Sequence, residues 1–254
     1  TSHQLRRPQR PPEPRGQALT QGKITLGLWN SRGRSNLHDA LPQLLGAEQV
    51  EAETHFDILG VTETAGSELN HPNYQAYHLA GQNRLGSGLS LYVHRTIRSR
   101  CTAVRNMGSE TLCIETDSLR VILTYISPSL NMEEFDRRLE ELGNLADGHH
   151  TPVLIGDFNA TTTSRSERLN RFLTEQSLCC DNDGLPTHVN GGVLDLVITP
   201  WELRVTVETT TLDFQSDHRL VIGTIETNVT RQRDRRRQRW RSTRRWRPEQ
   251  WDSM

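Results

Sequence analysis

The chain has 254 residues, of which 33% are hydrophobic and 24% are charged, and its formal net charge is −1. This size suits one large domain or two small ones. No apolar run approaches the roughly 20 residues of a membrane-spanning helix, and the Arg- and Pro-rich N-terminus has no apolar segment typical of a secretory signal. We therefore expect an intracellular protein with no membrane partner.

The near-zero net charge hides an uneven distribution. Residues 1–22 carry four arginines against one glutamate, which gives +3, and residues 231–254 carry ten arginines against three acidic residues, which gives +7. Residues 23–230 therefore carry −11. We expect a folded body over 23–230, a disordered basic Pro-rich arm over 1–22 and an Arg/Trp-rich linker to a following region over 231–254. The two basic segments fit either attraction to a polyanion through counterion release or linkers without a ligand.

Apolar runs with a period of two predict many strands in the body, and helical spacing of apolar residues predicts a few helices between them. The expected strands, in chain order, are 23–30, 56–61, 74–79, 89–93, 104–107, 111–115, 121–126, 153–155, 194–198, 203–208 and 220–225. The expected helices are 37–52, 131–146 and 165–177. Strands that outnumber the helices between them indicate an α/β sandwich with mixed sheets. The four cysteines lack metal-finger spacing and are expected to be reduced thiols.

Polar residues stand where several of these strands meet loops, which is where open α/β scaffolds build sites. The candidates are Asn30, Glu63, Tyr125, Asp157, Asn159, Asp195, Asp217 and His218. They form one site only if the strand ends share one edge of the molecule. Such a set of carboxylates and neighbouring polar groups suggests a metal-assisted reaction on a phosphate ester.

Each candidate has a chemical reading and a structural alternative. A carboxylate at Glu63 is suited to a hard divalent cation such as Mg²⁺, but it also suits a helix cap or the surface. Asp157 can orient or deprotonate water. Asn159, two residues on along an extended segment, either donates to a phosphate oxygen or orients Asp157. The alternative is an ordinary turn. Asn30, after the first strand, either orients Glu63 or a metal-bound water or serves as a turn residue.

The remaining candidates concern charge stabilisation at a phosphate. His218 can stabilise developing charge if a buried carboxylate orients it, and Asp195, among apolar neighbours, needs such a partner. Asp195 is otherwise an edge-strand residue that faces water. Tyr125 either offers its hydroxyl to a phosphate oxygen or packs in the core. His188, in the loop 183–193, either touches a substrate or packs locally.

Taken in order, these motifs resemble the endonuclease/exonuclease/phosphatase superfamily, whose members include DNase I, and most of all the endonuclease domains of non-LTR retrotransposons. The matching stretches are LGLWNSRG, ILGVTET, LTYISPS, LIGDFNA, VLDLVIT and SDHRLV. They extend over nearly the whole body. The stretch LTYISPS has no Asn where abasic-site enzymes often carry one, which argues against abasic-site specificity.

The resemblance implies a four-layer sandwich of two mixed sheets flanked by helices. It also implies Mg²⁺ or Mn²⁺ near Glu63, with Asn30 and Asp217 close by, and no small-molecule cofactor. In this superfamily the position of Asp157 is assigned to water activation, and the positions of Asn159 and Tyr125 contact the phosphate. The position of His218, paired with that of Asp195, stabilises the transition state.

The expected function is a metal-dependent endonuclease that nicks target DNA and leaves a 3′-hydroxyl to prime reverse transcription. DNA is then the partner, and the nucleus is where the protein would act on it. The alternatives are a phosphatase or RNA exonuclease of the same superfamily, or a degenerate domain that only binds nucleic acid. All the key polar positions are present, which favours an enzyme.

Overall fold

The computed structural model describes residues 22–46, 55–81, 87–105, 110–211 and 214–227. The N-terminal half contains β1 (Gly22–Asn30), α1 (Arg34–Leu45), β2 (Ile58–Thr62), β3 (Tyr74–Ala80), β4 (Gly88–His94), β5 (Arg100–Arg105), β6 (Glu110–Glu115) and β7 (Leu119–Tyr125). The C-terminal half contains α2 (Met132–Ala146), β8 (Thr151–Asp157), α3 (Thr163–Glu175), β9 (Leu178–Cys180), β10 (Asp195–Pro200), β11 (Val205–Thr209) and β12 (Val221–Thr227). The predicted basic segments lie almost wholly outside the described residues.

The strands form two six-stranded sheets. One has the order β11-β12-β1-β2-β4-β3 and the other the order β5-β6-β7-β8-β10-β9. Each sheet has one parallel pair, β1 with β2 and β7 with β8, and its other pairs are antiparallel. Both sheets are therefore mixed, as the sequence predicted.

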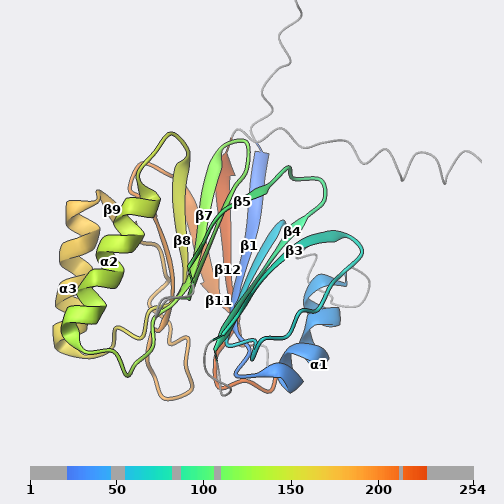
Figure 1. Ribbon diagram of the computed structural model, residues 1–254, viewed down its shortest axis with the longest axis horizontal. Coiled ribbons are helices and arrows are strands. Elements are labelled where there is room, and N and C mark those ends of the chain that lie inside the picture. Colours follow the sequence, from blue (N-terminus) through green and yellow to red (C-terminus); the bar gives the residue numbers. More distant parts are fainter. Residues whose placement is uncertain (1–21, 47–54, 82–86, 106–109, 212–213, 228–254) are drawn as a thin grey trace, which may run out of the picture.

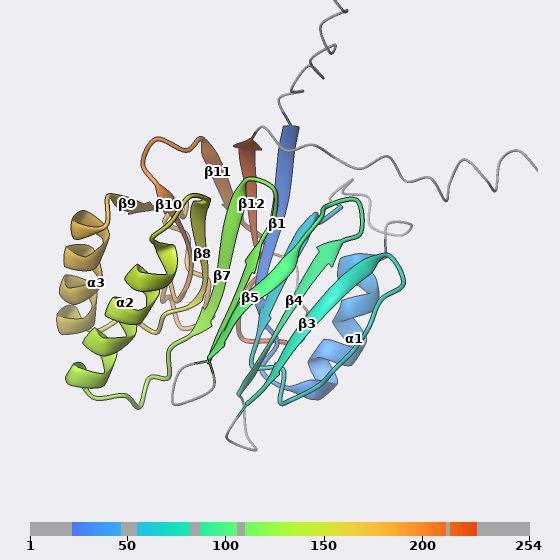
Figure 2. The same cartoon turned by 45° about the horizontal axis from the view of Figure 1, so that its top comes forward.

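The sheets pack face to face between helical layers (Figure 1). Helices α2 and α3 lie together outside the β7–β8 sheet, and α1 lies outside the other sheet, as the turned view in Figure 2 also shows. The predicted four-layer sandwich is confirmed. Burial on both faces explains the continuous apolar runs: in β8, Val153 and Ile155 face the core between the sheets, while Leu154 packs with the α2 and α3 side chains.

Two glycines allow close approaches beside the strand ends. A Cβ on Gly60 of β2 would lie 2.9 Å from side-chain atoms of both Leu123 and Ile155 in the opposite sheet. Gly156 has a φ of +155°, and a Cβ there would lie 1.9 Å from the carbonyl oxygen of Thr124. Side chains at these positions would separate the sheets or the β7–β8 pair just before the polar strand ends.

The predicted boundaries were wrong at several elements. Helix α1 begins at Arg34 and ends at Leu45 instead of covering 37–52, because Gly46 leaves the helix in an extended conformation. Residues 47–52 lie outside the described residues. Strand β5 begins at Arg100 instead of at 104, since a register shift after Cys101 interrupts the alternation that marks a strand, and it extends to Arg105. Residues 106 and 107 lie outside the described residues.

Smaller differences concern the C-terminal half. Helix α3 covers Thr163–Glu175 instead of 165–177, because Ser177 adopts a φ of 53° and cannot continue the helix. The three-residue strand β9 was not predicted, as it is too short to show a period. All four cysteines are free, in agreement with the prediction.

Candidate active site

The predicted site residues lie at the ends of strands that neighbour one another in the sheets. Tyr125 at the end of β7 is paired with Asp157 at the end of β8, and Asp157 is also paired with Asp195 at the start of β10. In the other sheet, Asn30 is paired with Thr62, the residue before Glu63. The two parallel pairs and the antiparallel β10 thus deliver their polar residues to one edge of the molecule.

The amide of Asn30 connects the two sheets at this edge. Its Nδ2 donates to Oε1 of Glu63 and to Oδ2 of Asp157, both at 3.0 Å. These two carboxylate oxygens are therefore at most 6.0 Å apart. The Oδ1 of Asn30 accepts the backbone N–H of Arg32 at 2.9 Å, so the N–H₂ group and not the oxygen faces the carboxylates. Asn30 thus donates to Glu63, as one of the roles proposed from the sequence requires, and its own oxygen accepts from Arg32.

Asp157 is almost completely buried in this cluster. Burial raises the pKa of its carboxyl well above the ordinary value, and the negative charge of Asp195 raises it further, against smaller opposing effects of His218 and Asn30. Two buried acids so close together disfavour two negative charges. A cation at this position would relieve that repulsion.

Asp195 and His218 form a buried pair. The sequence had indicated that a buried Asp195 would need a partner and that His218 could be that partner. Nδ1 of His218 lies 2.7 Å from Oδ2 of Asp195. Burial lowers the pKa of His218, but the hydrogen bond and charge of Asp195, together with the charges of Asp157 and Asp217, outweigh it and raise the pKa to about 9. The imidazole is therefore held in its protonated form at neutral pH, directed by a carboxylate.

Asp217 is held through one of its two oxygens. Its Oδ2 lies 3.0 Å from Nη1 of Arg32 and 3.5 Å from Nε2 of His188. Its Oδ1 is buried and has no hydrogen-bond partner among the described residues. Ser216 fixes the segment in place, because its hydroxyl donates to the carbonyl of Asn30 at 2.7 Å.

Tyr125 and Asn159 complete the cluster. Burial and the nearby charges of Glu63 and Asp157 raise the pKa of the Tyr125 hydroxyl, which stays protonated as a donor. Asn159 lies beside Asp157, but the prediction of an extended segment was wrong: its φ is 46°, in the left-handed region. Its backbone N–H donates to Oδ1 of Asp157 at 3.1 Å and its Nδ2 to the carbonyl of Ile126 at 3.1 Å. One amide N–H of Asn159 is left for another acceptor.

Comparison with known proteins bears on both sequence and fold. A family model described as endonuclease-reverse transcriptase matches residues 119–222, which is less than half of the chain. The comparison with curated protein sequences gave no match. The endonuclease domain of TRAS1, a telomere-specific non-LTR retrotransposon, superposes with a TM-score of 0.65 at 14% identity, covering 82% of this chain and 100% of that one.

Other solved structures superpose nearly as well. An AP endonuclease from Leishmania major gives a TM-score of 0.60 at 15% identity, over 81% of this chain and 88% of that one. The inositol polyphosphate 5-phosphatase domain of SPsynaptojanin, in complex with inositol (1,4)-bisphosphate and a calcium ion, gives 0.54 at 16% identity, over 81% and 84%. The chain has a DNase I-like fold. The resemblance to the endonuclease/exonuclease/phosphatase superfamily is thereby confirmed.

A divalent cation fits the donors that this DNase I-like fold brings together. The edge holds the carboxylates of Glu63, Asp157 and Asp217, and Mg²⁺ prefers such oxygen ligands. Oδ1 of Asp217 is buried without a hydrogen-bond partner among the described side chains, which is costly unless another group binds it. Asp157, Asp195 and His218 also bring ligand atoms within 4.8 Å of one another. The choice between Mg²⁺ and Mn²⁺ does not follow from these donors.

Several residues that support the site were not singled out from the sequence. Ser31 donates its hydroxyl to the carbonyls of Thr62 and Glu63, at 3.1 and 3.0 Å, and so fixes the turn that carries Glu63. Thr187 accepts the backbone N–H groups of Leu194 and Asp195 through its hydroxyl. Their only sequence signal is proximity to a candidate residue.

Arg165 of α3 is a buried support of the site loops. Its guanidinium donates to the carbonyls of Ser127, Pro128 and Leu130 after β7 and to that of Asn159 after β8. It also stacks 4.9 Å from the ring of Phe135. A single side chain thus ties together the two loops next to Tyr125 and Asp157.

Replacing Arg165 with Met is expected to lower the free energy of unfolding by about 3 kcal/mol, because buried carbonyls without donors cost about 1–3 kcal/mol each. Urea unfolding measures the change. Arg168→Met on the same helix is the matched control, since Arg168 forms a half-exposed ion pair with Asp136. The Arg168→Met change is expected to lower the free energy of unfolding by less than about 1 kcal/mol. Equal effects of both substitutions would contradict the role assigned to Arg165.

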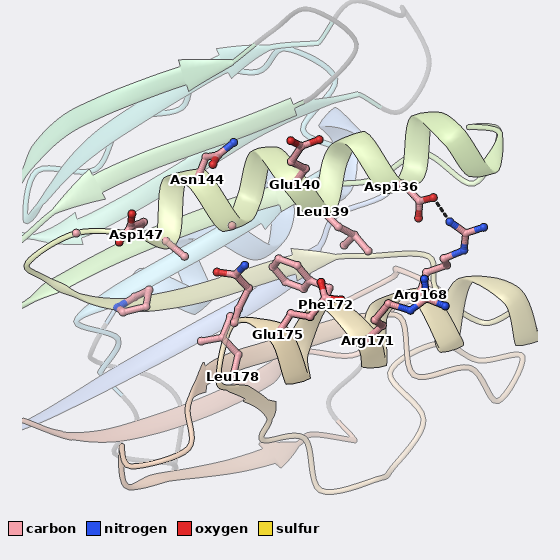
Figure 3. Close-up of a pocket in the computed structure, with 15 residues that line it drawn as sticks. Asp136, Leu139, Glu140, Asn144, Asp147, Arg168, Arg171, Phe172, Glu175 and Leu178 are labelled. Atoms are coloured by element: carbon pink, nitrogen blue, oxygen red, sulfur yellow. Dashed lines mark hydrogen bonds and ion pairs between the residues drawn. The ribbon is translucent and has the colours of Figure 1, made fainter.

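A groove of about 610 Å³ lies between α2 and α3, and none of the predicted site residues lines it. Figure 3 shows Arg168 of α3 pointing toward Asp136 of α2 at one end of this groove. None of the described helices is both long and apolar enough to span a bilayer. The predicted site residues therefore lie at the strand ends and apart from this groove.

Proposed function

We propose that the chain is a divalent-cation-dependent phosphodiesterase that nicks DNA, as the target-site endonuclease of a non-LTR retrotransposon polyprotein. The observation that carries the proposal is the pair of hydrogen bonds from Asn30 to Glu63 and Asp157, beside the buried Asp195–His218 pair. Together they put acidic ligands, a base and a protonated imidazole at one edge. The similarity to the TRAS1 endonuclease domain supports DNA as the substrate.

Glu63 and Asp217 would hold Mg²⁺ or Mn²⁺, with Asn30 orienting Glu63. When bound, the cation would neutralise charge on the phosphate and on the leaving oxygen. Its positive charge would also favour the ionised form of the buried Asp157. In that form Asp157 orients the attacking water and accepts its proton.

The other residues act on the phosphate. His218, protonated and directed by Asp195, donates to the phosphate oxygen on which negative charge grows. The Tyr125 hydroxyl and the remaining N–H of Asn159 donate to the same group and hold it in line. Hydrolysis in which water attacks phosphorus and the 3′-oxygen leaves gives a 5′-phosphate and a 3′-hydroxyl, the end that a reverse transcriptase extends.

The proposal is tested by relaxation of supercoiled plasmid. Purified protein is expected to convert plasmid to the open-circular form with Mg²⁺ or Mn²⁺ and to leave it supercoiled with EDTA. A DNA polymerase added after the reaction is expected to extend the nicks without any prior treatment of the 3′ ends. Nicks that need a 3′-phosphatase before extension would contradict the proposed position of cleavage.

A phosphatase acting on a small phosphate ester is the second candidate. It is favoured by the superposition on a 5-phosphatase domain that was solved with inositol (1,4)-bisphosphate. Phosphate release from an inositol phosphate and nucleotide panel separates the two functions. Release from the panel together with intact plasmid would replace the first proposal with the second, and neither activity would refute both.

A further inference from the structure

His188 lies in the loop between β9 and β10 and packs against the segment that carries Asp217 and His218. The backbone N–H of Val189 donates to the carbonyl of Asp217 at 2.9 Å, and His188 forms an antiparallel bridge with His218. The two imidazole rings meet edge to face, with centroids 4.7 Å apart. Backbone and ring contacts therefore fix the position of His188, which the sequence left open as a substrate contact or a local packing residue.

A backbone hydrogen bond also fixes its tautomer. The N–H of Asn190 donates to Nδ1 of His188 at 3.1 Å, and an imidazole nitrogen that accepts a hydrogen bond carries no proton. The proton of the neutral ring is then on Nε2, which lies 3.5 Å from Oδ2 of Asp217. His188 therefore presents an N–H to this carboxylate.

This tautomer argues against direct metal ligation by His188. Ligand atoms of His188, Asp217 and His218 lie within 4.8 Å of one another, a spacing that a metal ion could occupy. Ligation through Nε2 would require its lone pair, and that nitrogen carries the proton for as long as Asn190 donates to Nδ1. The arrangement instead leaves the Nε2–H of His188 3.5 Å from Oδ2 of Asp217.

The two oxygens of Asp217 are consequently used differently. Arg32 and His188 both face Oδ2, at 3.0 and 3.5 Å. Oδ1 is buried and accepts no hydrogen bond from any described residue. Donors on one oxygen fix the rotation of the carboxylate and leave the other oxygen available for a different positive partner.

We propose that His188 is a positioning residue, which holds Asp217 through Oδ2 so that Oδ1 is available to the divalent cation. The inference rests on the proposed function, because it takes Asp217 as a metal ligand. Groups that orient metal-ligating side chains change metal affinity by about 10- to 100-fold when they are removed. Arg32 alone does not replace His188, since its side chain is 64% exposed and less constrained.

Two substitutions separate donation from packing. His188→Phe keeps a ring against His218 but has no donor, whereas His188→Gln loses the ring but keeps an N–H near the place of Nε2. We measure Mn²⁺ binding without DNA, from the electron paramagnetic resonance signal of free Mn²⁺, and the melting temperature of each variant. His188→Phe is expected to weaken Mn²⁺ binding about 10- to 100-fold with little change in melting temperature. His188→Gln is expected to bind Mn²⁺ nearly as the unsubstituted protein does.

The control is His38→Phe on the exposed face of α1, which is expected to leave Mn²⁺ binding unchanged. Unchanged affinity in His188→Phe, or an equal loss in His188→Gln, would overturn the positioning role. Tight Mn²⁺ binding without plasmid nicking would refute the proposed function alone. The Mn²⁺ affinities of the His188 variants would still test the positioning role. An unsubstituted protein that binds no Mn²⁺ would overturn the inference itself.

Discussion

Asp157→Asn is expected to reduce the rate of plasmid nicking by about 10²- to 10⁴-fold, the range that a general base contributes. The substituted amide cannot accept a proton from water, although it can still accept one of the hydrogen bonds from Asn30 or Asn159. The loss should appear in kcat more than in KM, because the proposed role of Asp157 is in the transition state. Initial rates at saturating Mg²⁺ measure it.

The same substitution is expected to make metal-free stability less dependent on pH. The pKa of Asp157 is raised in the folded protein, so the fold favours the protonated carboxyl. Stability is then lost as pH rises from the unfolded value of 3.8 through the raised folded pKa. In EDTA, the melting temperature of the variant should therefore fall less between about pH 5 and about pH 8 than that of the unsubstituted protein. Asp39→Asn on the surface of α1 should change neither activity nor this slope.

Asp195→Asn and His218→Ala are each expected to lower kcat by about 10²- to 10⁴-fold, and the double variant by little more than the more damaging single change. The reason is that Asp195 is proposed to act on the phosphate through His218, which lies 2.7 Å from its Oδ2. Once the imidazole is gone, the carboxylate has nothing to orient. A double-mutant cycle on plasmid nicking measures the coupling.

A double variant whose rate loss is the product of the two single losses would contradict this expectation. Asp195 and His218 would then contribute independently and would not form a functional unit. Melting temperatures of all three variants should accompany the rates, since Asp195 is fully buried and its replacement also changes packing. A rate loss in a variant that is unfolded at the assay temperature carries no information about the pair.

Most of the fold could be predicted because central strands such as β2, β4 and β8 are buried on both faces, which leaves continuous apolar runs in the sequence. Helix α2 was also clear, since Asn131 and Glu134 form a capping box at its start, followed by a regular apolar spacing. The errors fell where periodicity fails. Strand β5 contains a register shift after Cys101, and β9 has three residues.

The sequence indicated single site residues and the Asp195–His218 pair, but not the groups that support them. Asp157 and Asp195 stand out because each is a carboxylate next to an apolar run. Arg165 was not singled out because it belongs to an outer helix. The role of His188 stayed open because the position of its loop depends on the whole fold. The left-handed backbone of Asn159 agrees with the turn that the sequence offered as the alternative, and not with the extended segment.

The hydrogen bond from Ser216 to Asn30 joins residues 186 positions apart, and β1 pairs with β12. The first and last described strands of the body thus meet beside the polar cluster. During synthesis on the ribosome, Asn30 emerges early but lacks its neighbours until the segment through Thr227 has been translated. The candidate site therefore cannot be complete in a nascent chain until both of these distant segments have been synthesised.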